Sequence, residues 1–321
     1  MNALQEAAAA IRAGTRFMVA AHAAPDGDAL GSMLATAHGL RTLGKEVFLY
    51  NEDAAPKRLA FLEGAKELRS SVPTGVTFDA TLVHDCGAAS LLGHRFPSRE
   101  VTGPLIILDH HASVSDFGDI VVRDASASAV GVLVARLYKE LGVALSRPMA
   151  EALWCSLVSD TGWFRYSATN VETLELATAC VQAGVEPWNF ARWSEEEWPP
   201  ARLRLLSLSF ASLELWPENR PFVALLRLDD KMLSEAGAGP DLGEGLVNYA
   251  RALQGIEVGI LLTSVRAGIR VSLRSKGGLD VGKVASQFGG GGHVAAAGCF
   301  FSASLDEAKA HLLTALAAAG S

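Results

Sequence analysis

Short apolar segments alternate with helical patterns through the first half of this 321-residue chain. The stretch ALGSMLATAHGLRTLG (29–44) repeats apolar residues at helical spacing and closes on Gly44, a typical helix terminator. Two further helices are expected over 129–141 and 149–158. Apolar strands that alternate with helices predict an α/β fold with a mainly parallel sheet sandwiched by helices. The five expected strands are FMVAAH (17–22), EVFLYN (46–51), DATLVHD (79–85), PLIILDH (104–110) and DIVVR (119–123).

The sequence changes in character after Glu186, where one stretch of about thirty residues holds four of the six tryptophans and a Pro-Pro pair. We interpret this stretch as a connector that contains a helix. It is followed by three strand-like segments, FVALLRL, IEVGILLTSV and GIRVSLRS, a glycine cluster and an Ala/Leu-rich helix. The expected organisation is an α/β domain over 1–190, a helical linker over 191–215 and a smaller α/β domain over 216–321.

Composition limits the kinds of molecule that this protein can bind and the compartment in which it is expected. The net charge of -7 disfavours tight binding to long or duplex nucleic acid, which normally needs a broad basic face. The four cysteines are scattered without a CxxC pair, which is typical of reduced thiols in a cytoplasmic protein. The N-terminus lacks the apolar core of a signal peptide, and no apolar segment approaches the ~20 residues that span a bilayer. We therefore expect a cytoplasmic protein without a membrane partner.

Acidic and imidazole side chains recur where the expected strands end. Each has an ordinary alternative: Asp26 in PDG could shape a turn, Asp28 could be a helix N-cap, and paired histidines could be polar residues at a sheet edge. Independent caps need not cluster, however, whereas the carboxyl ends of parallel strands meet at one edge of a sheet and bind ligands there. The residues that share this position are His22, Asp26, Asp28, Asp85, Asp109, His110 and His111, and they are joined by Asp160 at the end of ALWCSLVSD.

This set is rich in carboxylates, contains imidazoles and lacks thiolates, which suits Mn²⁺, Mg²⁺ or Co²⁺ better than a structural zinc ion. One ion would leave surplus negative charge on at least four carboxylates. Two ions ~3.5–4 Å apart, bridged by one carboxylate, would use the whole set. Such a pair binds a phosphate oxygen and activates a water molecule for in-line attack at phosphorus. The sequence therefore predicts a two-metal phosphoesterase centre.

The same motifs resemble those of the DHH phosphoesterase superfamily. The segment HAAPDGDA (22–29), Asp85, Asp109-His110-His111 and Asp160-Thr-Gly match its four motifs in order. The segment VSLRSKGGLDVGKVASQFGGGGHVAAAG (271–298) resembles the DHHA1-type domain of the family. The chain as a whole is similar to the NrnA-like branch. This resemblance implies hydrolysis of very short RNA and of 3'-phosphoadenosine 5'-phosphate (pAp), with Mn²⁺ as the cofactor and Co²⁺ or Mg²⁺ as alternatives.

The resemblance also implies a role for each residue. One metal would be held by His22, Asp26 and Asp85, and the other by Asp28, Asp85, His110 and Asp160, so that Asp85 bridges the two. Asp109 would orient an imidazole. His111 would face the scissile phosphate as a hydrogen-bond donor or general acid, because the pKa of imidazole lies near neutrality. Paired subunits would also fit the family.

One region departs from the family pattern. Related sequences tend to place a Ser-Thr or Ala-Thr pair followed by an acid in the helix after the fifth strand. Here that region reads ASASAVGVLVARL, and no acid precedes Glu140. Ser126 and Ser128 are left as candidates for contacting substrate or capping the helix. The departure affects the details of substrate recognition and leaves the expected metal ligands unchanged.

The glycine cluster GGGGH (289–293) predicts an anion-binding element. Glycines let the main chain approach a ligand, and successive N–H groups can form a nest for a phosphate at a helix start. Arg274 in VSLRSK could bind two phosphate oxygens through its planar guanidinium. Ser272 and Lys276 are weaker candidates. The expected substrate-binding residues, supported by the family match, are Arg274, Ser275, Gly290, Gly291, Gly292 and His293.

The leading hypothesis is an Mn²⁺-dependent phosphoesterase whose two domains hold a short single-stranded RNA or a mononucleotide bisphosphate between them. A phosphodiesterase for cyclic dinucleotides, or for linear products such as pApA, is the nearest alternative. A RecJ-like exonuclease is disfavoured because no basic, aromatic-rich extension is present. A pyrophosphatase is disfavoured by GGGGH and LRSK. A catalytically silent regulatory protein remains an alternative, since fold alone does not decide activity.

Overall fold

The computed structural model describes residues 2–111, 117–216 and 222–320. The chain divides into two compact units, Met1–Glu197 and Trp198–Ser321. Helix α7 (Pro187–Glu195) belongs to the first unit, whereas α8 (Pro200–Ala211) belongs to the second. The segment 191–215, expected as a separate linker, is therefore shared between the two units.

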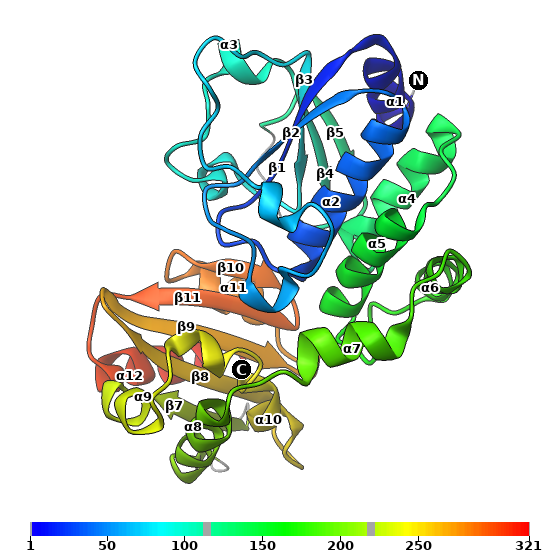
Figure 1. Cartoon of the computed structure of the whole chain (residues 1–321). Helices are drawn as coiled ribbons and strands as arrows, with labels where there is room; N and C mark the ends of the chain where they lie inside the picture. The colour runs from blue at the N-terminus through cyan, green and yellow to red at the C-terminus, as the bar shows by residue number, and fades with distance from the viewer. Residues whose placement is uncertain (1, 112–116, 217–221, 321) are drawn as a thin grey trace. The chain divides into compact units, whose positions relative to one another are not determined.

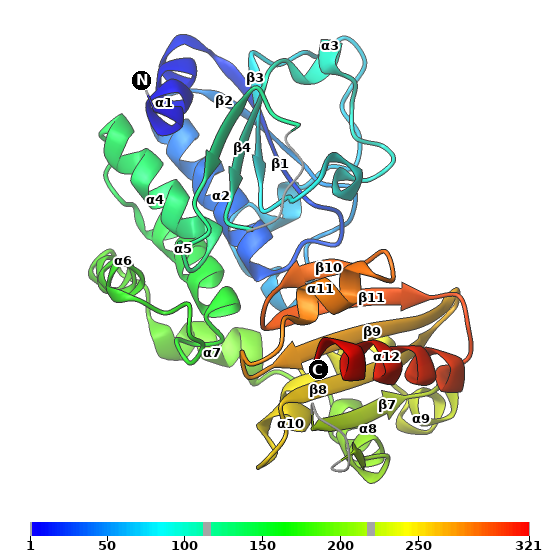
Figure 2. The same cartoon turned by 180° about the vertical axis from the view of Figure 1, so that it is seen from behind.

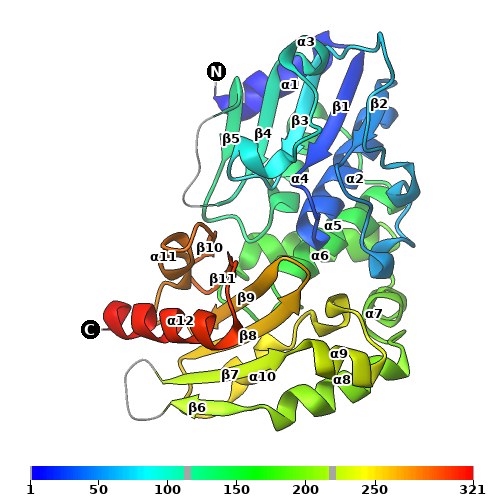
Figure 3. The same cartoon turned by 90° about the vertical axis from the view of Figure 1, so that its left-hand side faces the viewer.

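The first unit is built on a five-stranded sheet in which every neighbouring pair is parallel. Figure 3 shows its strands in the order β5, β4, β3, β1 and β2. The predicted parallel sheet is confirmed. The strands are β1 (Arg16–Ala21), β2 (Glu46–Tyr50), β3 (Ala80–His84), β4 (Leu105–Asp109) and β5 (Ile120–Arg123).

The two faces of this sheet are covered differently. Phe17 and Val19 of β1 pack into the main core with the long helices, whereas Met18 and Ala20 point to the opposite face, as strand alternation requires. That opposite face is covered by the segments 72–78 and 86–102 on either side of β3, whose only helices are the short η3 (Ala89–Leu92) and α3 (Arg99–Thr102). The helices on the main face are seen together in Figure 1: α1 (Ala3–Ala13), α2 (Gly27–Thr42), α4 (Val130–Leu141) and α5 (Arg147–Asp160).

Helix α2 is the centre of this unit. Every residue from Gly27 to Leu40 is buried, because α2 packs against the sheet, α4 and α5 at once. A Cβ at Gly31 would lie 2.5 Å from the Ala152 carbonyl oxygen of α5, so the absence of a side chain lets the two helices approach closely. The first turn of α2, which carries Asp28, is therefore held rigidly at the edge of the sheet. Helix α6 (Val171–Gln182) and the short helices η1 (Lys57–Leu59) and η2 (Ala65–Glu67) complete the unit.

The second unit contains a mixed six-stranded sheet in the order β10-β11-β9-β8-β7-β6, in which only β7 and β8 are parallel neighbours. Helices α11 and α12 cover one face, and α8, α9 and α10 pack over β7 and β8 on the other (Figure 2). The predicted α/β class of this unit is confirmed. Its strands are β6 (Glu214–Trp216), β7 (Val223–Leu228), β8 (Val258–Val265), β9 (Gly268–Ser275), β10 (Gly291–His293) and β11 (Ala296–Phe301), and its remaining helices are α9 (Asp230–Ala236), η4 (Pro240–Gly243), α10 (Val247–Ala252), α11 (Val281–Ser286) and α12 (Leu305–Ala319).

The four cysteines are buried and unbridged, as expected for core thiols. Burial raises the pKa of Cys86 to about 12, which keeps this thiol protonated beside Asp85. Among the described residues, no helix has both the length and the apolar character that a membrane crossing requires.

Candidate metal centre

The acidic and imidazole residues predicted from the sequence meet at the carboxyl end of the parallel sheet. His22 follows β1, Asp85 follows β3, and Asp109 ends β4. Because these strands are adjacent in the sheet, residues far apart in the sequence become neighbours in space. Asp28 in the first turn of α2 and Asp160 at the end of α5 approach the same edge from the helical layer.

Asp85 lies at the middle of this cluster, and its two oxygens face different partners. Oδ2 is 3.7 Å from His22 Nε2, whereas Oδ1 is 3.8 Å from His110 Nε2 and 3.5 Å from His111 Nδ1. The main chain of Asp85 adopts a left-handed conformation, with φ of 50°, which is uncommon outside glycine. Such strain persists where the surroundings enforce it, and it places this buried carboxylate between two groups of potential ligands.

His22 and His110 are oriented in the same way. The Nδ1 of His22 lies 2.6 Å from the Ala23 carbonyl oxygen, and the Nδ1 of His110 lies 3.0 Å from the Ala127 carbonyl oxygen. A carbonyl can only accept, so Nδ1 carries the proton in both rings and Nε2 faces the carboxylates. Histidines that bind metals are typically anchored in this manner, with the second nitrogen donating to a carbonyl or carboxylate.

Asp28 and Asp160 form a second group with His110. The Nε2 of His110 lies 3.1 Å from Asp160 Oδ2 and 3.6 Å from Asp28 Oδ2. Asp28 is completely buried in the first turn of α2. The N-cap of α2 is Asp26, which accepts hydrogen bonds from the N–H groups of Asp28 and Ala29 at 3.0 Å. The capping role considered for Asp28 at this helix therefore belongs to Asp26.

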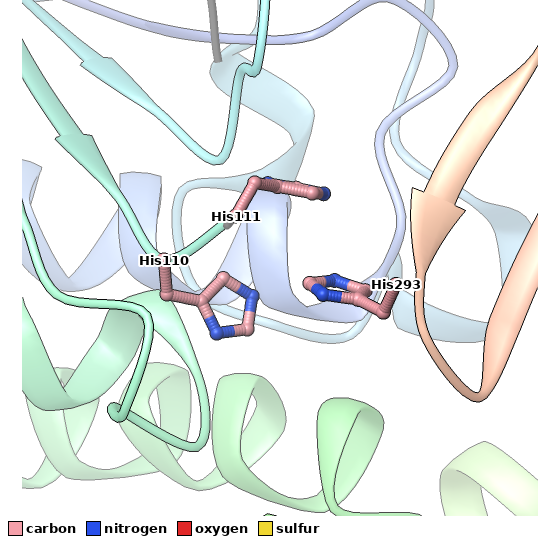
Figure 4. A group of neighbouring side chains, drawn as sticks. All are labelled: His110, His111 and His293. Atoms are coloured by element: carbon pink, nitrogen blue, oxygen red, sulfur yellow. The ribbon is translucent and has the colours of Figure 1, made fainter. Parts of the chain in front are cut away.

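The Asp109-His110-His111 segment sends its two imidazoles in different directions (Figure 4), with ring centroids 5.4 Å apart. His111 Nδ1 donates to Asp109 Oδ1 at 2.7 Å, and the N–H of His111 reaches the same oxygen at 3.3 Å. Asp109 is fully buried, whereas the side chain of His111 is 24% exposed. Asp109 thus fixes the orientation and the tautomer of an imidazole that solvent can still reach.

Crowding of charged groups shifts the pKa values of several residues in the cluster. Burial, together with the charges of Asp160 and Asp85, raises the pKa of Asp28 well above its usual range. Burial opposes protonation of His22 and His110, but the neighbouring carboxylates outweigh it and raise their pKa values to about 9 and about 11. Burial likewise favours a neutral Asp85, yet the adjacent imidazoles lower its pKa to about 2. The cluster therefore attracts positive charge strongly.

The donors fit a pair of divalent cations. Within the described part of the first unit, three sets have ligand atoms within 4.8 Å of one another: His22, Asp26 and Asp85; Asp28, His110 and Asp160; and Asp85, Asp109 and His111. Two buried oxygens, Asp85 Oδ1 and Asp109 Oδ2, have no hydrogen-bond partner among the residues that the structure describes. A cation would stabilise buried carboxylate oxygens in this condition, and oxygen and imidazole donors suit Mn²⁺ or Mg²⁺.

Comparison with known proteins agrees with this geometry. The model of the DHH family, N-terminal domain, matches residues 16–157, and that of the DHHA1 domain matches residues 226–319. The bifunctional oligoribonuclease and PAP phosphatase NrnA of Thermus thermophilus is 31% identical over 306 residues, which cover 93% of this chain and 88% of that protein. The chain belongs to the DHH family. Within this family of phosphoesterases it falls in the NrnA-like branch.

A second sequence relative and a solved structure are also similar to this chain over most of its length. The protein of the same name from Bacillus subtilis is 28% identical over 286 residues, which cover 86% of each chain. The crystal structure of an exopolyphosphatase-related protein from Bacteroides fragilis superposes with a TM-score of 0.89 at 24% identity, covering 98% of this chain and 95% of that one. The structural match confirms the fold of both units.

The DHHA1 unit brings Arg274 and His293 to one face of its sheet. Both residues are paired in register with Ala296 of β11, Arg274 from β9 and His293 from β10. Residues in register on neighbouring strands point to the same face, so two cationic or hydrogen-bonding side chains flank Ala296. Ser275 points to the other face and is buried, and its hydroxyl donates to the Val294 carbonyl oxygen at 3.2 Å.

The glycine cluster forms a strand, whereas the sequence suggested a nest at a helix start. Gly291–His293 is β10, which pairs with β11. A Cβ at Gly290 would lie 2.1 Å from the Gly298 carbonyl oxygen, and a Cβ at Gly292 would lie 2.4 Å from that of Ala296. These two glycines permit the close approach of two strands. Gly291 is exposed, and a Cβ there would meet nothing within 4 Å.

Sequence reasoning missed several buried groups that bond to the candidate metal ligands or lie next to them. Ser156 of α5 and the N–H of Val130 bind the Asp28 carboxylate. Thr36 of α2 donates to Nε2 of the buried His84, whose other ring nitrogen faces the Ala20 carbonyl oxygen. Burial lowers the pKa of His84 to about 4, so the ring is neutral. These residues carry no local signal, since each acts across helices and strands far apart in the sequence.

The two serines singled out after the fifth strand do not cap α4. Ser126 donates to Asp124 at 2.6 Å, and Ser128 accepts a hydrogen bond from Thr173 of α6 at 2.7 Å. The N-cap of α4 is Ala129, which has no side-chain acceptor. The alternative that either serine caps this helix is therefore wrong.

Proposed function

We propose that this chain is a phosphoesterase that depends on two divalent ions, with Mn²⁺ the preferred ion, and hydrolyses short oligoribonucleotides and pAp. The observation that carries the proposal is the buried Asp85, whose two oxygens face two separate sets of carboxylate and imidazole donors. The names of the Thermus and Bacillus relatives support the choice of substrates.

The proposed ligands of the first ion are His22, Asp26 and Asp85, and those of the second are Asp28, Asp85, His110 and Asp160. Divalent ions held by these residues would polarise a phosphoryl oxygen and lower the pKa of a water molecule. Carboxylate and imidazole donors without a thiolate favour Mn²⁺ over zinc, and Co²⁺ and Mg²⁺ are the alternatives.

His111 is the proposed proton donor to the leaving oxygen. Its Nδ1 donates to Asp109 at 2.7 Å, and its side chain is 24% exposed, so a substrate can reach the ring. The adjacent carboxylates outweigh the effect of burial and raise the pKa of His111, so the ring tends to carry the proton that a leaving group requires. Asp109 acts through His111 as an orienting residue.

The DHHA1 unit supplies the proposed anion-binding face, made by Arg274, His293 and the exposed main chain at Gly291. Arginine can bind two phosphate oxygens at once, and an imidazole can donate to a phosphate or a ribose hydroxyl. Gly290 and Gly292 contribute by allowing β10 to lie close to β11. Ser275 remains a predicted contact whose hydroxyl is already bonded to the main chain.

The experiment is a comparison of turnover by the purified full-length chain with Mn²⁺. The substrates are pAp, RNA of two to five nucleotides, a long single-stranded RNA, pApA, cyclic di-AMP and pyrophosphate. We expect the highest rates on pAp and on the shortest RNA. Prior removal of metal with a chelator should abolish hydrolysis, and Mn²⁺ should restore it.

Two other results would change the proposed function. Dominant cleavage of cyclic di-AMP or pApA would replace the proposed substrates by dinucleotides. Absence of hydrolysis of every substrate by a chain shown to bind Mn²⁺ would overturn the enzymatic proposal and favour a regulatory nucleotide-binding protein.

A further inference from the structure

The first N–H groups of α4 donate hydrogen bonds to side chains of two other helices, α2 and α5. Its N-cap, Ala129, has no side-chain acceptor, yet the first two amides of the helix are bonded. The N–H of Val130 donates to Asp28 Oδ2 at 2.8 Å, and the N–H of Gly131 donates to Ser156 Oγ at 2.9 Å. The Ser156 hydroxyl then donates to Asp28 Oδ1 at 2.5 Å. The carboxylate of Asp28 therefore caps α4 once directly and once through Ser156.

Packing holds the Ser156 hydroxyl in one place. Asp28 and Ser156 are both 0% exposed, so neither can turn toward water. A Cβ at Gly131 would lie 2.2 Å from Ser156 Oγ, and a Cβ at Gly31 would lie 2.7 Å from Ser156 N. Close contact among α2, α4 and α5 at these glycines fixes the serine between the carboxylate and the N–H of Gly131.

The two oxygens of Asp28 consequently have different environments. Oδ1 is occupied by Ser156, whereas Oδ2 lies 3.6 Å from His110 Nε2 on the side of the cluster. Each oxygen accepts one hydrogen bond, Oδ1 from Ser156 and Oδ2 from Val130, and can accept twice, so the position of Oδ2 beside His110 is what distinguishes the two. The side chain can thus offer one oxygen, in a fixed direction, to a cation.

We propose that Ser156 is a positioning residue that locks Asp28 with only Oδ2 presented to a divalent ion. The inference rests on the metal centre of the proposed function. Ser156 does not touch the ion or the substrate. It determines which oxygen of Asp28 is available and keeps that oxygen in place before any ion arrives.

Ser156→Ala tests the proposal, and Ser32→Ala is the matched control. Ser32 is equally buried and also bonds Asp28, but its hydroxyl donates at 2.7 Å to the main-chain carbonyl oxygen, within α2. Mn²⁺ affinity of the full chain is measured by titration calorimetry after chelation. Loss of a residue that orients a ligand typically weakens metal binding about 10- to 100-fold. We expect such a loss in Ser156→Ala, while Ser32→Ala binds Mn²⁺ like the wild type.

Amide hydrogen exchange of the metal-free chain provides a second readout. Ser156→Ala should speed exchange at Gly131, which loses its acceptor, and Ser32→Ala should leave this amide protected. If Ser156→Ala does not fold, Ser156→Cys replaces it. The thiol is a weaker donor, so its Mn²⁺ affinity should lie below that of the wild type.

The outcomes separate this inference from the proposed function. Wild-type Mn²⁺ binding with unchanged affinity in the Ser156 variant would overturn the role of Ser156 and leave the metal centre standing. Equal losses in Ser156→Ala and Ser32→Ala would show a general packing effect and would also overturn it. Failure of the wild-type chain to bind Mn²⁺ would overturn the metal centre and this inference together.

Discussion

The acidic cluster of the first unit and the Arg274–His293 face of the second present charge in opposite ways. Asp28, Asp85 and His110 are 0%, 4% and 6% exposed, and their neighbours are other ionisable groups. Arg274 and His293 are only partly buried on the surface of a sheet. Buried charges must be balanced by a permanent counter-charge, whereas accessible cations can exchange one anion for another. In the proposed function, this difference would separate a site that retains ions from a surface that binds and releases substrate.

Substitution of Asp85 should have the largest effect. Asp85→Asn keeps the shape and tolerates the left-handed main chain, since asparagine often adopts this conformation. It removes the charge shared by both sets of donors, so we expect hydrolysis to fall by a factor on the order of 1,000 or more. Steady-state rates with Mn²⁺ and a thermal melt measure activity and folding. Asp241→Asn, an exposed change in the second unit, should have no effect. Unchanged turnover in Asp85→Asn would refute the two-metal centre.

Arg274→Ala should act on substrate binding more than on chemistry. Loss of a charge-assisted contact to phosphate costs about 1.5–3 kcal/mol, equivalent to about a 10- to 150-fold rise in KM for pAp. Arg270→Ala is the control. Arg270 lies on the same face of β9, four residues earlier, so this variant removes an equal charge at a position that is not beside His293. A comparable rise in KM for both variants would show a diffuse electrostatic effect and contradict the specific contact.

Thr36→Val tests whether buried polar contacts beneath the cluster stabilise the first unit. The substitution removes the donor to His84 Nε2, 2.7 Å away, and leaves a buried nitrogen without its partner. We expect the free energy of unfolding to fall by about 1–3 kcal/mol. The control is Thr314→Val on α12, where the hydroxyl is exposed. Chemical denaturation measures both variants, and equal losses would contradict a special role for the Thr36–His84 pair.

The smallest effect is expected at Arg136, which pairs with Asp124 and Glu172 at 2.6 Å on the surface of the first unit. Hydrogen bonds from Ser126 and Arg136 lower the pKa of Asp124 to about 2, and Arg136 also lowers the pKa of Glu172. Lowered carboxyl pKa values stabilise the fold above about pH 4, and this contribution is lost as the pH falls toward 2.

Partial exposure of these side chains limits the contribution to about 0.5–1 kcal/mol at pH 7. Arg136→Met should therefore lower the urea midpoint at pH 7, and the difference from the wild type should shrink at pH 3. A difference that is independent of pH would assign the effect to packing.

The sequence predicted the elements whose patterns are local. Buried strands are uniform apolar segments, and helices 129–141 and 149–158 were found within two residues of α4 and α5. The predicted ligands His22, Asp85 and His110 converge because they follow adjacent parallel strands, whereas Asp160 reaches the same edge from the end of α5. The same reasoning could not find Ser156, which meets Asp28 across 128 residues of sequence.

The glycine cluster shows most clearly where prediction from local sequence fails. GGGGH is compatible with a nest, a turn or a strand, and pairing with β11 selects the strand. Asp26 and Asp28 show the same ambiguity, since either could have capped α2. Tertiary packing determines the conformation in both cases, and it cannot be predicted from the local sequence pattern.

The most direct test of the account is the number of divalent ions that the cluster binds. The full-length chain is stripped with a chelator, titrated with Mn²⁺ by calorimetry and checked by elemental analysis after dialysis. We predict two Mn²⁺ ions per wild-type chain and the loss of tight binding in Asp85→Asn. A folded wild-type chain that binds no Mn²⁺, or binds a single ion that survives in Asp85→Asn, would contradict the bridged pair.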